Sequence, residues 1–128
     1  MNFKPTQPPR AFQVGLPGKT FPLYDCGRLE LAPDEQVTLV TPSGTEFDVA
    51  RKTWGYYATP SLNARLPRFN LRAVLGKSSD GKYFLLLVER GKEAEFERYM
   101  SENKQTVVCW MDDTPALEKL ETQVRGKA

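Results

Sequence analysis

Hydrophobic and polar residues alternate along much of the first half of the chain, and this pattern predicts β-strands. Alternating runs cover residues 28–31, 36–41 and 45–50. The Pro-Ser-Gly segment between the last two is typical of a turn. In the third run, Phe47 and Val49 lie on one face and acidic residues on the other. Short alternating strands joined by turns favour an antiparallel sheet with one face in solvent.

Two further alternating runs, at residues 62–66 and 69–75, are also predicted to be strands. Their leucines would point into the core, so Arg65 and Arg72 would point away from it. Both arginines are therefore expected to be solvent-exposed cations on a sheet.

A Ser-Ser-Asp-Gly segment at residues 78–81 gives the strongest turn pattern in the chain, because Asp-Gly tolerates left-handed backbone. Residues 70–76 and 82–89 are therefore predicted to form a hairpin. The run Tyr83–Val88 is apolar without alternation, which is typical of a strand buried on both faces. We expect it to be the central strand of the sheet.

Helical periodicity is confined to the C-terminal third of the chain. Residues 92–103 carry apolar positions at helical spacing. A second helix is predicted to start at the Asp-Asp-Thr-Pro segment 112–115 and to end at Gly126. Residues 107–111 form a strand between them. This order predicts an α+β fold, a mainly antiparallel β-sheet with two C-terminal helices packed on one face.

The N-terminal residues 1–19 are rich in proline and glycine and are predicted to be a flexible arm. Residues 20–128 have the length of a single α+β domain. No apolar run approaches the roughly 20 residues that span a bilayer, and no signal-peptide pattern is present. We therefore expect a cytoplasmic protein with no membrane association.

One segment, Arg51–Lys77, changes this ordinary picture. It holds six basic residues and no acid. Because the whole chain carries +2, the remaining residues carry −4. The segment also contains Trp54, Tyr56, Tyr57 and Phe69. Such a field attracts anions, although solvation of strand faces by basic side chains explains the same composition.

The candidate ligand-binding residues come from this segment because of their chemistry. Arginine forks match phosphate oxygens, and an exposed aromatic face stacks on bases or sugars. Trp54 and Phe69 are expected to be core residues, whereas Tyr57 is expected to be exposed. The predicted site comprises Arg51, Lys52, Tyr57, Asn63, Arg65, Arg68 and Arg72.

Catalysis is not favoured by the residue types present. The chain has no histidine, which removes the commonest general base and metal ligand. Cys26 and Cys109 lie far apart and outside any paired-cysteine motif. The adjacent Asp112 and Asp113 are ordinary helix-capping residues. We expect no catalytic residues, no metal and no cofactor.

These observations leave two functional hypotheses. The first is a non-catalytic domain that binds an anionic ligand, either nucleic acid or a phosphorylated metabolite, through residues 51–77. The alternative is a protein–protein interaction domain or accessory subunit without a small-molecule ligand. For the first, the double substitution Arg65→Glu with Arg72→Glu is expected to abolish binding and leave the fold intact.

Overall fold

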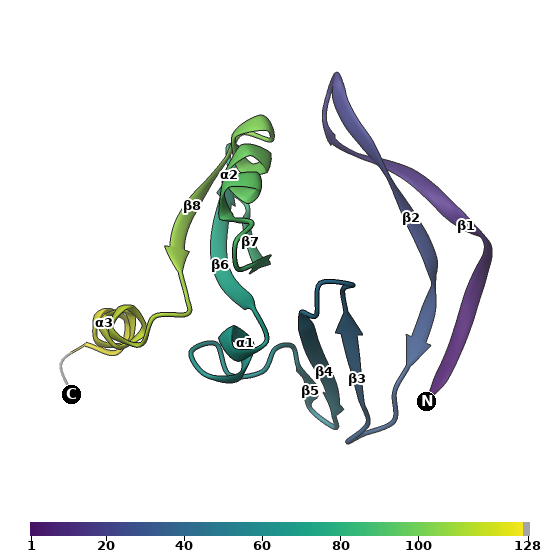
Figure 1. The fold of residues 1–128 in the computed structure, drawn as a ribbon, viewed down its shortest axis with the longest axis horizontal. Coiled ribbons are helices and arrows are strands. Elements are labelled where there is room, and N and C mark those ends of the chain that lie inside the picture. Colours follow the sequence, from purple (N-terminus) through teal and green to yellow (C-terminus); the bar gives the residue numbers. More distant parts are fainter. Residues whose placement is uncertain (127–128) are drawn as a thin grey trace. The chain divides into compact units, whose positions relative to one another are not determined.

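The N-terminal part of the chain forms a long two-stranded ribbon in the computed structural model, which describes residues 1–126 (Figure 1). Strand β1 (Asn2–Leu16) pairs antiparallel with β2 (Lys19–Glu30), and the register shifts between Pro5 and Arg10. Residues 1–19 are therefore extended, and that they act as a flexible arm stays a prediction.

The described residues group into two compact units. Unit 1 comprises residues 1–37 and 50–57, and unit 2 comprises residues 38–49 together with the chain from residue 58 onward. The chain passes from one unit to the other within β3 (Gln36–Val40) and β4 (Glu46–Lys52). That residues 20–128 behave as one domain stays a prediction.

In unit 1, the chain after the ribbon is fixed to β4 by backbone hydrogen bonds. The Asp34 amide donates to the Arg51 carbonyl at 2.7 Å, and the Arg51 amide donates to the Glu35 carbonyl at 2.9 Å. Strand β5 (Gly55–Tyr57) pairs antiparallel with β4, with Arg51 directly opposite Tyr56. The two hydrogen bonds engage both the amide and the carbonyl of Arg51.

In unit 2, β6 (Leu71–Ser78) is the central strand of a three-stranded antiparallel sheet. It lies between β7 (Tyr83–Glu89) and β8 (Gln105–Trp110). The predicted hairpin is confirmed, but the prediction that its second strand is central is wrong. The apolar side chains at the start of β7 are exposed because no layer covers them, so a continuous apolar run did not mark a central position.

Both predicted C-terminal helices are present. Helix α2 (Glu93–Glu102) packs on β7 and β8, and α3 (Thr114–Arg125) follows β8 (Figure 1). The α+β prediction with mainly antiparallel pairing is confirmed. Gly76 of β6 leaves room for the Met100 side chain of α2, because a Cβ there would lie 2.9 Å from the Met100 Cε atom.

The predicted strand at residues 62–66 is wrong, because the short helix α1 (Arg65–Arg68) occupies this part of the chain. The Ser61 carbonyl accepts the Leu66 amide at 3.0 Å, and the Ser61 hydroxyl accepts the Arg65 amide at 2.8 Å. Pro67 has no amide to donate to a neighbouring strand, and its fixed φ suits a helical turn.

Glu89, at the end of β7, ties the turn between β3 and β4 to the sheet of unit 2. Its Oε1 atom accepts hydrogen bonds from the hydroxyls of Thr45, Thr41 and Ser43 at 2.7, 2.8 and 2.9 Å. Its Oε2 atom lies 3.0 Å from the Lys92 Nζ atom. The Thr45 hydroxyl first, and then Lys92 and the other hydroxyls, lower the pKa of Glu89 to about 2.

This carboxylate is expected to make the stability of unit 2 depend on acid pH. Because the pKa of Glu89 in the folded protein lies below its ordinary value of 4.5, its stabilisation is complete above that pH and is lost as pH falls toward about 2. We expect Glu89→Gln to lower the melting temperature at neutral pH, by an amount that shrinks below pH 4.5.

Thermal unfolding of the wild type and Glu89→Gln across this pH range measures the effect. Glu118→Gln, on the exposed face of α3, is the matched control and should follow the wild type. A deficit of Glu89→Gln that stays constant down to pH 2 would contradict the hydrogen-bonded carboxylate.

A candidate anion-binding groove

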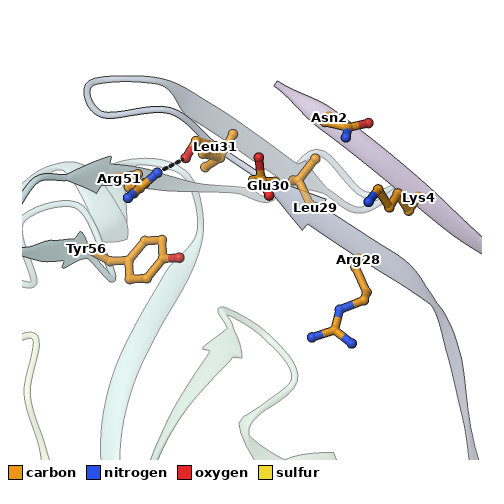
Figure 2. A pocket seen from close by; sticks show the side chains of 8 residues that line it. All are labelled: Asn2, Lys4, Arg28, Leu29, Glu30, Leu31, Arg51 and Tyr56. Atoms are coloured by element: carbon orange, nitrogen blue, oxygen red, sulfur yellow. Dashed lines mark hydrogen bonds between the residues drawn. The ribbon is translucent and has the colours of Figure 1, made fainter.

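A groove in unit 1 lies between the end of the ribbon and the β4–β5 hairpin (Figure 2). Its volume is about 640 Å³, within the range of pockets that hold one small-molecule ligand. The lining residues are Asn2, Lys4, Arg28, Leu29, Glu30, Leu31, Arg51 and Tyr56.

Two cations occupy directly paired positions of the ribbon at this groove. Lys4 of β1 is the register partner of Arg28 of β2, so the two side chains leave the same face of the sheet. Like charges directly opposite each other destabilise an antiparallel pair. Within the part of the chain that the structure describes, neither cation has a carboxylate within 4.0 Å. An anion between them would remove this repulsion.

The close approach of the two strands at this point requires a glycine. Gly27 precedes Arg28 and has a φ of 154°. A Cβ atom at Gly27 would lie 2.6 Å from the Lys4 carbonyl oxygen and 2.9 Å from the Phe3 ring. Real Cβ atoms do not approach neighbours this closely. The glycine therefore permits the strand spacing that sets Lys4 opposite Arg28.

Arg51 and Tyr56 form the other side of the groove. The Arg51 Nη1 atom donates to the Leu31 carbonyl at 2.6 Å, which fixes the half-buried guanidinium. No salt bridge to a carboxylate engages it among residues 1–126. Tyr56 is the register partner of Arg51 and is exposed, and Figure 2 shows its ring projecting from β5 with the hydroxyl directed toward β2.

Of the predicted site residues in unit 1, only Arg51 lines the groove. Lys52 pairs with Asp34 at 2.5 Å, and this hydrogen bond raises the pKa of Lys52. Tyr57 is exposed as predicted, with its ring 5.5 Å from that of Trp54. The prediction that Trp54 is a core residue is wrong, because it is 67% exposed at the tip of the β4–β5 hairpin, where no second layer covers it.

In unit 2, Arg65 is held by neighbours rather than presented on a strand. Its Nε atom donates to Asp48 at 3.0 Å, and its guanidinium lies 4.6 Å from the centroid of the Phe69 ring, a residue that is only half-buried. The Thr38 hydroxyl and then Arg65 lower the pKa of Asp48. Arg65 is thus a stacked, ion-paired residue on α1.

Arg72 is engaged more extensively. Its Nε atom donates to Asp112 Oδ2 at 2.6 Å and its Nη2 atom to Asp112 Oδ1 at 3.3 Å, while Nη1 reaches Glu93 at 3.3 Å. The guanidinium also lies 4.0 Å from the centroid of the Trp110 ring. Hydrogen bonding to Arg72 lowers the pKa of Asp112. These contacts satisfy the guanidinium within the protein.

The two other predicted site residues in unit 2 differ from each other. Asn63 donates from Nδ2 to the Thr114 hydroxyl at 3.0 Å. Arg68 is exposed on α1 and has no salt bridge among the described residues. The basic segment 51–77 is therefore divided between the two units.

Sequence reasoning missed Lys4, Arg28 and Glu30 because they lie outside the basic segment. Arg28 and Glu30 belong to an alternating run, which indicated only an exposed strand face. Lys4 lies in the segment predicted to be an arm, whose pairing cannot be derived from its proline-rich composition. The only indication in the sequence was that this end of each strand carries a basic residue. That the two basic residues are paired becomes clear only from the register of β1 and β2.

Comparison of the chain with models of protein families, with curated proteins and with solved structures finds no match. Among residues 1–126, no helix is both long and apolar enough to cross a bilayer. The same residues contain no cluster of three potential metal-ligating side chains. The function must therefore be inferred from the geometry of the groove.

Proposed function

We propose that unit 1 binds an anionic ligand through a phosphate group in the groove. The observation that supports this proposal is the Lys4–Arg28 pair, two cations at directly paired positions of the ribbon that have no carboxylate partner among residues 1–126. Arg51 adds a third cation whose guanidinium is fixed by the Leu31 carbonyl. Arginine forks match phosphate oxygens in geometry and keep their charge at every physiological pH.

This proposal keeps the anionic ligand that the sequence suggested but moves its site. Arg51 is the only residue of the predicted set that lines the groove. Arg65 and Arg72 are paired with carboxylates, and their guanidinium groups are used within unit 2. The positive charge available to a ligand is therefore contributed mainly by the ribbon, at Lys4 and Arg28.

Arg28→Gln tests the proposal because it removes one charge from the groove and keeps a polar side chain at this position. A hydrogen bond to a charged group contributes roughly 1.5–3 kcal/mol, so the affinity for pyrophosphate should fall by about tenfold or more. Lys19→Gln is the matched control, since Lys19 is exposed on the same ribbon at its opposite end. Titration calorimetry at low salt measures both variants.

Absence of pyrophosphate binding by the wild type would overturn the proposal. An equal loss for Arg28→Gln and Lys19→Gln would do so as well, because it would mean a diffuse charge effect. In either case the protein–protein alternative would take its place. The exposed apolar side chains of the ribbon, among them Phe3, Phe12 and Leu23, would then be its first candidates.

A further inference from the structure

We infer that the ligand of the groove is a phosphorylated sugar rather than a polynucleotide. This inference rests on the proposed function and concerns the uncharged part of the ligand. The deciding residue is Glu30, which lines the same groove as the three cations. Glu30 is the register partner of Asn2 and lies two residues after Arg28 on β2. Because alternate residues of a strand share a face, the Asn2–Glu30 and Lys4–Arg28 pairs project from the same face of the ribbon.

Glu30 keeps its acceptor capacity for a ligand. Among residues 1–126, its carboxylate has no salt bridge within 4.0 Å and no side-chain hydrogen bond. Two residues of strand span about 6.6 Å, so Glu30 follows the cationic pair at roughly the length of one sugar ring. The groove thus has a cationic region and, next to it, a region that accepts hydrogen bonds.

The charge of Glu30 distinguishes the two ligand classes. A polynucleotide carries a phosphate on every nucleotide, and a second phosphate beside Glu30 would meet a like charge at short range. A sugar carries hydroxyl groups at this distance from its phosphate, and a carboxylate accepts hydrogen bonds from hydroxyls strongly. The Asn2 side-chain amide, opposite Glu30, can both donate and accept.

The remaining lining suits a sugar ring in shape and polarity. Tyr56 offers an exposed aromatic face and a hydroxyl directed toward β2 (Figure 2). Leu29 and Leu31 contribute the apolar part of the lining. A volume of about 640 Å³ holds a monosaccharide phosphate or disaccharide phosphate.

The test compares four probes on the full chain by titration calorimetry: inorganic phosphate, glucose 6-phosphate, glucose and a ten-nucleotide oligothymidine. We expect glucose 6-phosphate to bind about tenfold more tightly than phosphate, because the sugar adds hydrogen bonds to the charged Glu30. Glucose alone should show no measurable binding. The oligonucleotide should bind more weakly than glucose 6-phosphate.

Glu30→Gln should remove most of the advantage of glucose 6-phosphate over phosphate and should strengthen the binding of phosphate itself, because a negative charge is gone. Glu118→Gln makes the same change in net charge outside the groove and should leave the ratio of the two affinities unchanged. Circular dichroism of both variants confirms that the fold is retained.

The outcomes separate this inference from the proposed function. Binding of phosphate with no gain for glucose 6-phosphate leaves the proposed function standing and overturns the sugar assignment. Tighter binding of the oligonucleotide overturns it in favour of nucleic acid. If none of the anions binds, the proposed function fails and the inference fails with it.

Discussion

Replacing Leu66 with alanine is expected to lower the free energy of unfolding of unit 2 by about 2–5 kcal/mol. The Leu66 side chain is 0% exposed and packs in a cluster with Leu71 and Ala73 of β6. Phe47 and Leu62 border the same cluster. Truncation would leave a cavity that these neighbours cannot fill, because α1 is fixed to the chain by the hydrogen bonds of Ser61.

Urea unfolding followed by circular dichroism measures this loss. Leu120→Ala is the matched control, since Leu120 on α3 is 38% exposed and loses the same atoms from a partly exposed position. We expect the control to lose clearly less than Leu66→Ala. Equal losses in the two variants would mean that α1 does not contribute to the core of unit 2.

Arg72→Met is expected to cost about 3 kcal/mol, the lower end of the range for breaking a buried ion pair. The Asp112 side chain is only 9% exposed, and Arg72 supplies its two side-chain hydrogen bonds. Without Arg72, this carboxylate would be left in a largely buried place without its hydrogen-bonded partner, and only the more distant charge of Arg90 would act on it. Arg68→Met, which removes an exposed and unpaired cation of the described chain, should change stability by less than about 0.5 kcal/mol.

The pH dependence gives a second readout for the Arg72 prediction. Arg72 lowers the pKa of Asp112 below its ordinary value of 3.8, so the stabilisation by this pair is present above that pH and is lost in stronger acid. The stability difference between the wild type and Arg72→Met should therefore narrow as pH falls below 3.8. A difference that is independent of pH would contradict the ion-pair explanation.

The contacts of Arg72 with Asp112 and Glu93 also change the expected effect of a charge reversal at Arg72. Glutamate at this position would face Asp112 and Glu93, three carboxylates in place of one cation and two anions. The double substitution Arg65→Glu with Arg72→Glu is therefore expected to unfold unit 2 rather than leave it intact. Loss of ligand binding in that variant would carry no information about a binding site.

Periodicity predicted the elements whose pattern is determined locally. The β6–β7 hairpin followed from its Asp-Gly turn, and α2 followed from apolar residues at helical spacing. The position of β7 in the sheet could not be predicted in this way. β7 is an edge strand because β8, from a distant part of the chain, pairs with the other side of β6. The apolar run of β7 gives no information about that pairing.

The residues of the candidate groove were even harder to predict, because they are brought together by pairing between distant segments. Arg51 was predicted because its neighbours in sequence are basic, but Lys4 and Arg28 meet only through the register of the ribbon. That register shifts between Pro5 and Arg10, in a proline-rich stretch whose pairing pattern cannot be read from composition. Conversely, Arg65 and Arg72 looked available because their carboxylate partners lie 17 and 40 residues away along the chain.

Gly27 makes the groove vulnerable to a change that no inventory of charged residues would detect. An alanine there would place a methyl group against the Lys4 carbonyl oxygen, so β1 would have to move away from β2. The distance between Lys4 and Arg28 would then grow although both cations remain. A related chain could therefore keep every charged residue of the groove and still have lost the site. The residue at position 27 would distinguish a chain that retains the site from one that has lost it.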